Sequence, residues 1–76
     1  MELTVLAFAH ARETFGFSSR EVICDPGDTP REILERLVPG ADTRHLAVAV
    51  DSEYHSLDAP VGDARELALI PPVSGG

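Results

Sequence analysis

The last six residues of the chain have the pattern most specific for chemistry, although they offer almost no reactive side chains. They read Pro71-Pro72-Val73-Ser74-Gly75-Gly76. A terminal pair of glycines can enter a slot too narrow for any Cβ, and it leaves the α-carboxylate of Gly76 as the one chemical group at the tip. The pattern therefore predicts a carboxylate that another protein activates, with the rest of the chain as its holder.

The residues before the two glycines indicate how this carboxylate is presented. An apolar run at 67–70 predicts a final strand, and Pro71 and Pro72 end it because proline lacks an N–H donor and fixes φ. Six extended residues at about 3.3 Å each reach roughly 20 Å from the domain. A frayed chain end without any role is the alternative that the sequence leaves open.

Composition limits the classes of protein to which the chain can belong. Its 76 residues are 43% hydrophobic and 25% charged, which predicts one folded domain over residues 1–76. The net charge of −7 argues against nucleic-acid binding and fits either a basic partner surface or simple solubility. No transmembrane run or signal peptide is found, and Cys24 has no second cysteine to pair with, so we expect a cytoplasmic protein.

Hydrophobic periodicity predicts the element order β-β-α-β-(β)-β. The expected strands are residues 2–9, 20–25, 46–50, 54–55 and 66–70, with a short helical turn at 10–16 and the main helix at 30–38. The simplest layer arrangement is a mixed sheet of four or five strands with one main helix packed across it. A right-handed crossover places the last strand beside the first, parallel to it and at the sheet centre. This is the α+β, ubiquitin-like β-grasp arrangement, and it directs residues 71–76 out from the middle of the sheet.

The main helix has the clearest local signals in the sequence. Thr29 is expected to begin it as the N-cap of a capping box that Glu32 completes. On the exposed side, residues four apart predict ion pairs between Glu32 and Arg36 and between Arg31 and Glu35.

Alternation along the first and last strands predicts a second apolar surface, on the sheet face away from the helix. Leu6, Phe8 and Ile70 share this face, and Tyr54 lies nearby. A monomer rarely exposes such a patch unless a partner covers it, although coverage by the protein's own loops is the alternative. We predict that this patch and the first four tail residues, 71–74, contact partner proteins.

No other residues form a recognisable catalytic or metal-binding pattern. His10, His45 and His55 lack the spacing and the paired cysteines of a metal site, and no acid–base pair or nucleophile motif can be found. Cys24 is interpreted as a small buried hydrophobic residue. We therefore expect neither a bound metal nor a bound cofactor.

The chain resembles the small, sulfur-carrying subunits of molybdopterin synthases. The resemblance rests on residues 6–13, on Ala49-Val50-Asp51 and above all on the closing stretch 63–76. It departs at Asp63-Ala64-Arg65, where the family usually has Asp-Gly-Asp, and at Asp51, where the family often has Asn. Because Ala64 does not take a φ > 0 turn position as cheaply as glycine, we expect another turn type there.

The resemblance implies a mechanism for the C-terminus. An E1-like adenylating enzyme would use ATP to join Gly76 to AMP, and a sulfur donor would displace AMP to leave a thiocarboxylate. Gly75 and Gly76 would then enter the large subunit of molybdopterin synthase and pass sulfur to cyclic pyranopterin monophosphate in molybdenum cofactor biosynthesis. The chain would be a non-catalytic subunit of that sulfurtransferase.

Three other roles remain open from the sequence. The chain could carry sulfur for another pathway, such as thiamin, cysteine or tRNA thiolation. It could be a ubiquitin-like modifier that is joined to lysines of target proteins. It could also be an interaction module whose tail is inert.

Overall fold

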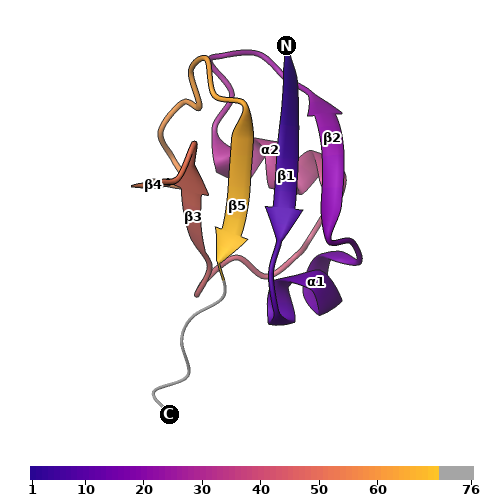
Figure 1. Ribbon diagram of the computed structural model, residues 1–76. Helices are drawn as coiled ribbons and strands as arrows, with labels where there is room; N and C mark the ends of the chain where they lie inside the picture. Colours follow the sequence, from indigo (N-terminus) through magenta and orange to yellow (C-terminus); the bar gives the residue numbers. More distant parts are fainter. Residues whose placement is uncertain (71–76) are drawn as a thin grey trace.

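The computed structural model describes residues 1–70, and the predicted tail at 71–76 lies outside the described residues. Within residues 1–70 the elements are β1 (Glu2–Ala7), α1 (His10–Phe15), β2 (Ser19–Ile23), α2 (Pro30–Leu37), β3 (Ala47–Val50), β4 (Glu53–His55) and β5 (Glu66–Ile70) (Figure 1). Every predicted strand is present in this part of the chain. The predictions were too long for β1 and placed β2 one to two residues late.

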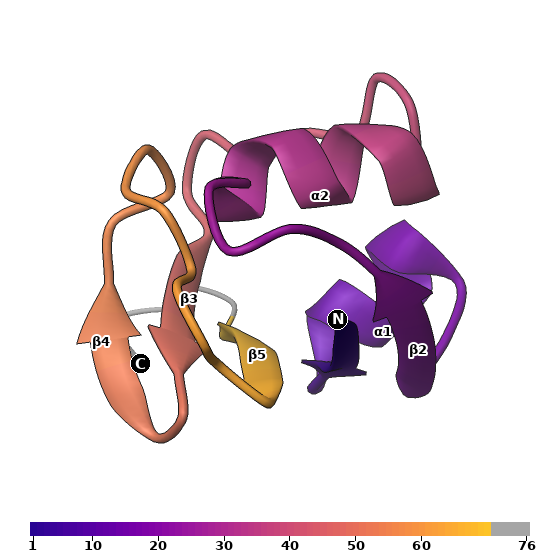
Figure 2. The same cartoon turned by 90° about the horizontal axis from the view of Figure 1, so that it is seen from above.

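The five strands form one mixed sheet with the order β2-β1-β5-β3-β4. The strand β5 lies at the centre, parallel to β1 on one side and antiparallel to β3 on the other. The helix α2 packs across one face of this sheet (Figure 2). The predicted α+β, β-grasp arrangement with a central last strand is therefore confirmed.

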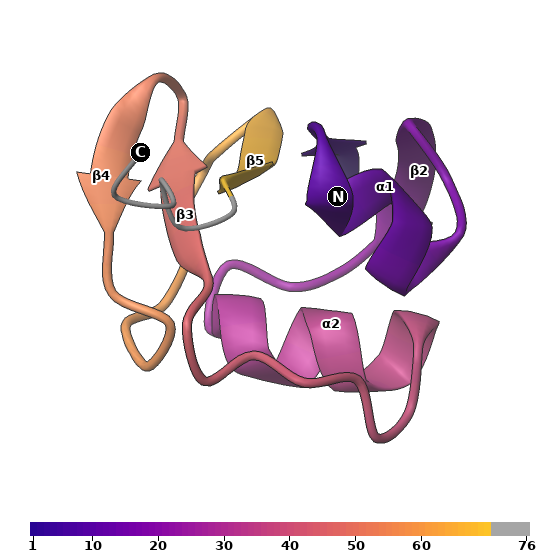
Figure 3. The same cartoon turned by 90° about the horizontal axis from the view of Figure 1, so that it is seen from below.

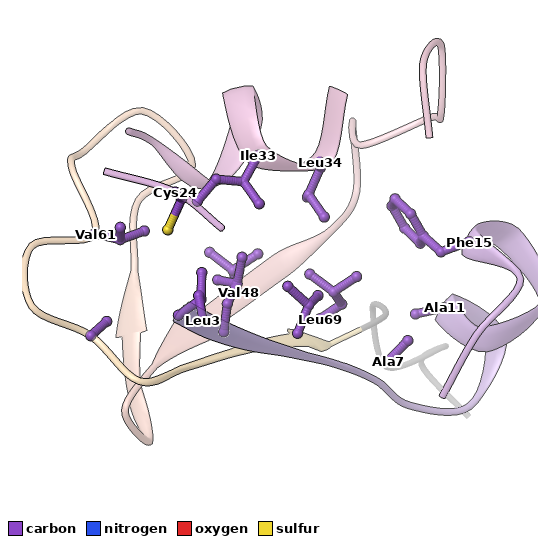
Figure 4. Close-up of a cluster of buried hydrophobic side chains, with 13 residues drawn as sticks. Leu3, Ala7, Ala11, Phe15, Cys24, Ile33, Leu34, Val48, Val61 and Leu69 are labelled. Atoms are coloured by element: carbon purple, nitrogen blue, oxygen red, sulfur yellow. The ribbon is translucent and has the colours of Figure 1, made fainter. Parts of the chain in front are cut away.

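The hydrophobic core lies between the sheet and α2. Alternate residues of the central strands point toward the helix, and Leu3, Val5, Leu67 and Leu69 are completely buried. They pack with other buried side chains, among them Ile33, Leu34, Val48 and Phe15 (Figure 4). Cys24 is 3% exposed in the same cluster, so its interpretation as a buried hydrophobic residue is confirmed. Burial raises the pKa of its thiol, which keeps the sulfur protonated and unreactive.

The predicted capping box begins α2. The Thr29 hydroxyl accepts a hydrogen bond from the N–H of Glu32 at 3.2 Å, and the Glu32 carboxylate accepts one from the N–H of Thr29 at 2.9 Å. At the other end of the helix, the Glu35 carboxylate accepts from the N–H of Gly40 at 3.3 Å. Both glutamates of α2 thus satisfy backbone donors at the helix ends.

The two ion pairs predicted along α2 were wrong. Arg31 instead binds Asp58 at 2.7 Å, and Arg36 binds Asp28 at 2.6 Å. Because α2's own glutamates are engaged by backbone N–H groups, its arginines turn to aspartates on the flanking loops. The N–H of Asp25 and the Arg36 guanidinium hold the pKa of Asp28 below its usual range, and Arg31 does the same for the pKa of Asp58.

The loop between β4 and β5 is fixed by one carboxylate from the β3–β4 turn. Asp51 has a positive φ of 48°, and its Oδ1 accepts hydrogen bonds from the N–H groups of Arg65 and Glu66 at 2.9 and 3.0 Å. In the loop between β4 and β5, Gly62 is the residue with a positive φ. Ala64 has an ordinary negative φ and is buried. The loop therefore avoids placing a Cβ in the left-handed region at Ala64, as expected.

A strained turn connects β1 to α1. The Phe8 carbonyl accepts a hydrogen bond from the N–H of Ala11 at 2.9 Å, and Ala9 between them has φ 47° and ψ −124°. A backbone conformation of this kind is ordinarily taken by glycine, because a Cβ is crowded there.

Replacing Ala9 by glycine is expected to raise the free energy of unfolding by about 1 kcal/mol. Relief of Cβ strain outweighs the larger conformational freedom that glycine gives the unfolded chain. In a domain of this size the melting temperature should rise by about 4–8 °C, measured by circular dichroism. Gly16, with φ 83°, caps α1 and supplies the opposite control, since Gly16→Ala should lower stability. A lower melting temperature for Ala9→Gly would contradict the assignment of strain.

Candidate partner-binding face and the root of the tail

The last described residue, Ile70, ends β5 at the centre of the sheet. The strand is paired along both edges, with Leu69 opposite Ala7 on one side and opposite Val48 on the other. Figure 1 shows that β5 ends at the same end of the sheet as α1. The segment that follows Ile70 is thus attached to a strand held from both sides. The predicted site residues Pro71, Pro72, Val73, Ser74, Gly75 and Gly76 themselves lie outside the described part of the chain.

Strand register places an apolar row across the sheet face opposite α2. Leu6 lies opposite Ala68 and Ala68 opposite Ala49, which in turn lies opposite Tyr54. The next row toward the end of β5 contains Ile70 and Phe8. Seen from below, α2 covers one side of the sheet, and these two rows belong to the opposite side (Figure 3). The predicted sharing of one face by the four partner-binding candidates is confirmed.

We call this surface the apolar face, and its members are Leu6, Phe8, Ala49, Tyr54, Ala68 and Ile70. Leu6 and Ile70 are half-buried and the two alanines are buried, but the large side chains of Phe8 and Tyr54 remain accessible, at 51% and 81% exposure. No loop among residues 1–70 buries them, which decides against the alternative of coverage by described loops. The sequence prediction missed the two alanines, although their alternation with Val48 and Leu67 along β3 and β5 was the signal that could have found them.

The apolar face occupies only the half of the sheet nearest the end of β5. In the adjoining row, Thr4 lies opposite Glu66 on one side and opposite Glu21 on the other. Farther still, the exposed Ile23 lies opposite Glu2 at the sheet edge. A protein that covers the apolar half therefore also meets the root of the tail.

The histidines lie apart from this face. His10 and His45 line a cavity of about 120 Å³ between α1 and the loop before β3, together with Asp42. Arg44 lowers the pKa of Asp42 to about 2, so that carboxylate is ionised. Within residues 1–70 no three His, Cys, Asp or Glu side chains gather as metal ligands would. Neither helix in this part of the chain has the length and apolar character needed to cross a membrane.

Solved structures with the same fold define the class of protein. The chain is similar to the crystal structure of SAMP1 from Haloferax volcanii, with a TM-score of 0.76 and 28% identity over 100% of both chains. It is similar to a putative molybdopterin converting factor, subunit 1, from Pyrococcus furiosus, with a TM-score of 0.73 and 22% identity over 96% of this chain and 99% of that one. A crystal structure of H. volcanii small archaeal modifier protein 1 gives a TM-score of 0.73 at 26% identity, over 95% and 98% of the two chains. The chain is a ubiquitin-like β-grasp protein.

Sequence comparison then gives the family. The profile of the ThiS family matches residues 5–76, and the chain belongs to this family. It is 37% identical over 81 residues to the molybdopterin synthase sulfur carrier subunit of Arabidopsis thaliana, covering all of this chain and 84% of that protein. It is 33% identical over 81 residues to the subunit of the same name from Escherichia coli, covering 97% and 99% of the two chains. The resemblance predicted from the sequence is confirmed.

Proposed function

We propose that the chain is the sulfur carrier subunit of a molybdopterin synthase. The observation that supports this most directly is the central position of β5, which ends beside an exposed apolar face and whose sequence continues after Ile70 to Gly75-Gly76. The relatives named as molybdopterin synthase sulfur carrier subunits support the choice of pathway.

The proposed chemistry is confined to the carboxyl group of Gly76. Its oxygen attacks the α-phosphorus of ATP in an E1-like adenylating enzyme, which releases pyrophosphate and leaves an acyl-adenylate. The terminal sulfur of a donor persulfide then attacks the carbonyl carbon and AMP departs, and a thiol cleaves the resulting acyl disulfide, forms a disulfide with the donor and leaves a thiocarboxylate on Gly76. This anion keeps part of its charge on a polarisable sulfur, which is a far better nucleophile than the original carboxylate oxygen.

The second partner in this proposal is the large, catalytic subunit of the synthase. There the thiocarboxylate sulfur attacks cyclic pyranopterin monophosphate, and water hydrolyses the resulting thioester, which leaves the sulfur on the pterin and returns the carrier with an ordinary carboxylate. Two sulfurs are needed for the dithiolene, so two charged carriers act on each pterin. The carrier holds no cofactor in this scheme, ATP is consumed by its activating enzyme, and both reactions belong to the cytoplasm.

In this scheme, residues 1–70 anchor the tail and provide the surface on which the partners dock. Pairing of β5 with both neighbours fixes where the tail starts, and fixed positioning of a reacting group contributes several kcal/mol to catalysis. The apolar face supplies the area on which each partner docks, one after the other. The chain's basic side chains are all arginine, so a charged carrier meets no lysine side chain on a second copy that would attack it.

A protein modifier is the second candidate function, and the fold similarity to small archaeal modifier protein 1 favours it. Mass spectrometry separates the two after incubation with ATP, an adenylating enzyme and a sulfur donor. A terminus in which one oxygen is replaced by sulfur supports the carrier. Isopeptide bonds from Gly76 to lysines of other proteins support the modifier, and an unchanged terminus contradicts both.

A further inference from the structure

The strand β2 forms one edge of the sheet, and half of its backbone groups face outward. Met1 and Cys24 exchange both backbone hydrogen bonds, at 2.9 and 2.8 Å, so they form a hydrogen-bonded pair of the β1–β2 ladder. Such pairs alternate with non-bonded ones along an antiparallel ladder. The N–H and C=O groups of Ser19, Glu21 and Ile23 therefore point away from β1, and all three residues are exposed.

A groove runs along this free edge, between β2 and α2. Its volume is about 260 Å³. Val22 from β2 meets Ile33 and Leu37 from α2 along it, and all three pack with or within the core. An extended chain paired with β2 would point alternate side chains into this groove, because successive side chains of a strand point to opposite faces.

The charged side chains at the groove favour an acidic ligand. Arg20 and Arg36 line it from the strand and from the helix, while the acidic Glu21 follows Arg20 on β2. Glu21 alternates with Arg20 and Val22, so its side chain belongs to the opposite face of the sheet. Arg20 forms no ion pair with any residue in 1–70, whereas Arg36 already binds Asp28. A carboxylate next to Arg20 would therefore gain a partner without breaking one.

A second copy of this chain fits the edge poorly. In the two-fold antiparallel register with full overlap, Glu21 would lie directly opposite Glu21 of the other copy, and like charges opposite each other destabilise a sheet. This like-charge pair at the centre of β2 leaves a peptide segment of another protein as the occupant.

We propose that the β2 edge binds an extended acidic peptide segment of a partner, which adds a sixth strand to the sheet. Backbone pairing is made with Ser19, Glu21 and Ile23. An apolar side chain of the peptide lies between Val22, Ile33 and Leu37, and a carboxylate side chain two residues away binds Arg20. This site is separate from the apolar face and does not depend on the proposed sulfur chemistry.

The test uses the intact protein labelled with ¹⁵N and a synthetic seven-residue peptide with blocked ends. In this peptide, valine and aspartate occupy the positions that face the groove, and threonine occupies all other positions. Binding should shift the amide signals of Ser19, Glu21 and Ile23 and slow their hydrogen exchange at least about tenfold. A matched peptide with lysine in place of aspartate should bind about tenfold more weakly, and Arg20→Glu should reverse that preference.

A separate variant tests the proposed backbone hydrogen bonds between β2 and the peptide. Glu21→Pro removes an N–H that faces outward, so the β1–β2 ladder and the fold persist, but pairing with the peptide is lost. Arg12→Glu, at an exposed position on α1, is the charge control and should leave peptide binding unchanged. Shifts confined to Leu6, Phe8 and Tyr54, no shift at millimolar peptide, or a concentration-dependent dimer in place of peptide binding would each overturn the proposal.

Discussion

Deleting Gly75 and Gly76, or adding one alanine after Gly76, should abolish sulfur transfer to the pterin. An added residue moves the reacting carbonyl by about 3.3 Å, and displacements near 1 Å already reduce catalysis about 100-fold. We therefore expect losses of at least about 1,000-fold in pterin thiolation, measured with the large synthase subunit and carriers whose terminal thiocarboxylate is installed chemically. The adenylation step should fail as well, because the same carboxyl group reacts in both enzymes.

The fold should not respond to these changes at the tail. The core described between the sheet and α2 is built from residues within 1–70, and these changes alter none of them, so the melting temperature should stay within about 2 °C of the unmodified protein. An alanine inserted after the exposed Gly40 is the matched control for chain lengthening, and it should leave thiolation nearly unchanged. Full thiolation by a carrier extended at Gly76 would refute the proposed function.

The sequence alone was sufficient for the fold because its signals are local and agree with one another. The Thr29–Glu32 capping box begins α2, and the alternation in Leu67 and Leu69 marks the buried side of β5. Each of these signals depends on residues a few positions apart, and the crossover rule then permits few arrangements.

The predicted ion pairs of α2 were wrong because residues distant in the sequence replaced the local partners of its arginines. Arg31 and Asp58 are 27 positions apart, so their ion pair could not be inferred from helical spacing. The strain at Ala9 was also missed, because alanine offers no sequence signal for a positive φ. Ala49 and Ala68 were overlooked as members of the apolar face because small residues contribute little to a hydrophobic pattern, and each is only 8% exposed.

The position of the apolar face would allow one small domain to serve both partners of the proposed function. The apolar face and the end of β5 lie at the same end of the sheet. The other half of the sheet surface opposite α2 contains Glu21 and Glu66. Any protein that docks on the apolar half therefore lies next to the end of β5, from which the tail continues. In the proposed function, docking and delivery of the C-terminus are coupled through this shared position.

Phe8→Asp should weaken binding to the adenylating enzyme and to the large subunit by at least about 100-fold each. The phenyl ring is 51% exposed in the free chain, so its remaining surface is available to a partner. Loss of that burial costs about 1.5–3 kcal/mol, and a carboxylate enclosed in an apolar interface adds a desolvation penalty. Titration calorimetry with each partner measures the effect.

The domain itself should remain folded, because Phe8 lies outside the core and its turn is closed by backbone hydrogen bonds. Ile23→Asp is the control with the same change in chemistry, since Ile23 is 72% exposed on the same side of the sheet but beyond the acidic row. It should alter either affinity by less than about threefold. Equal losses for Phe8→Asp and Ile23→Asp would assign binding to the whole sheet face, and unchanged affinity for Phe8→Asp would show that both partners dock elsewhere. If only one partner is lost, the two enzymes use different surfaces, and the coupling of docking to tail delivery applies to that partner alone.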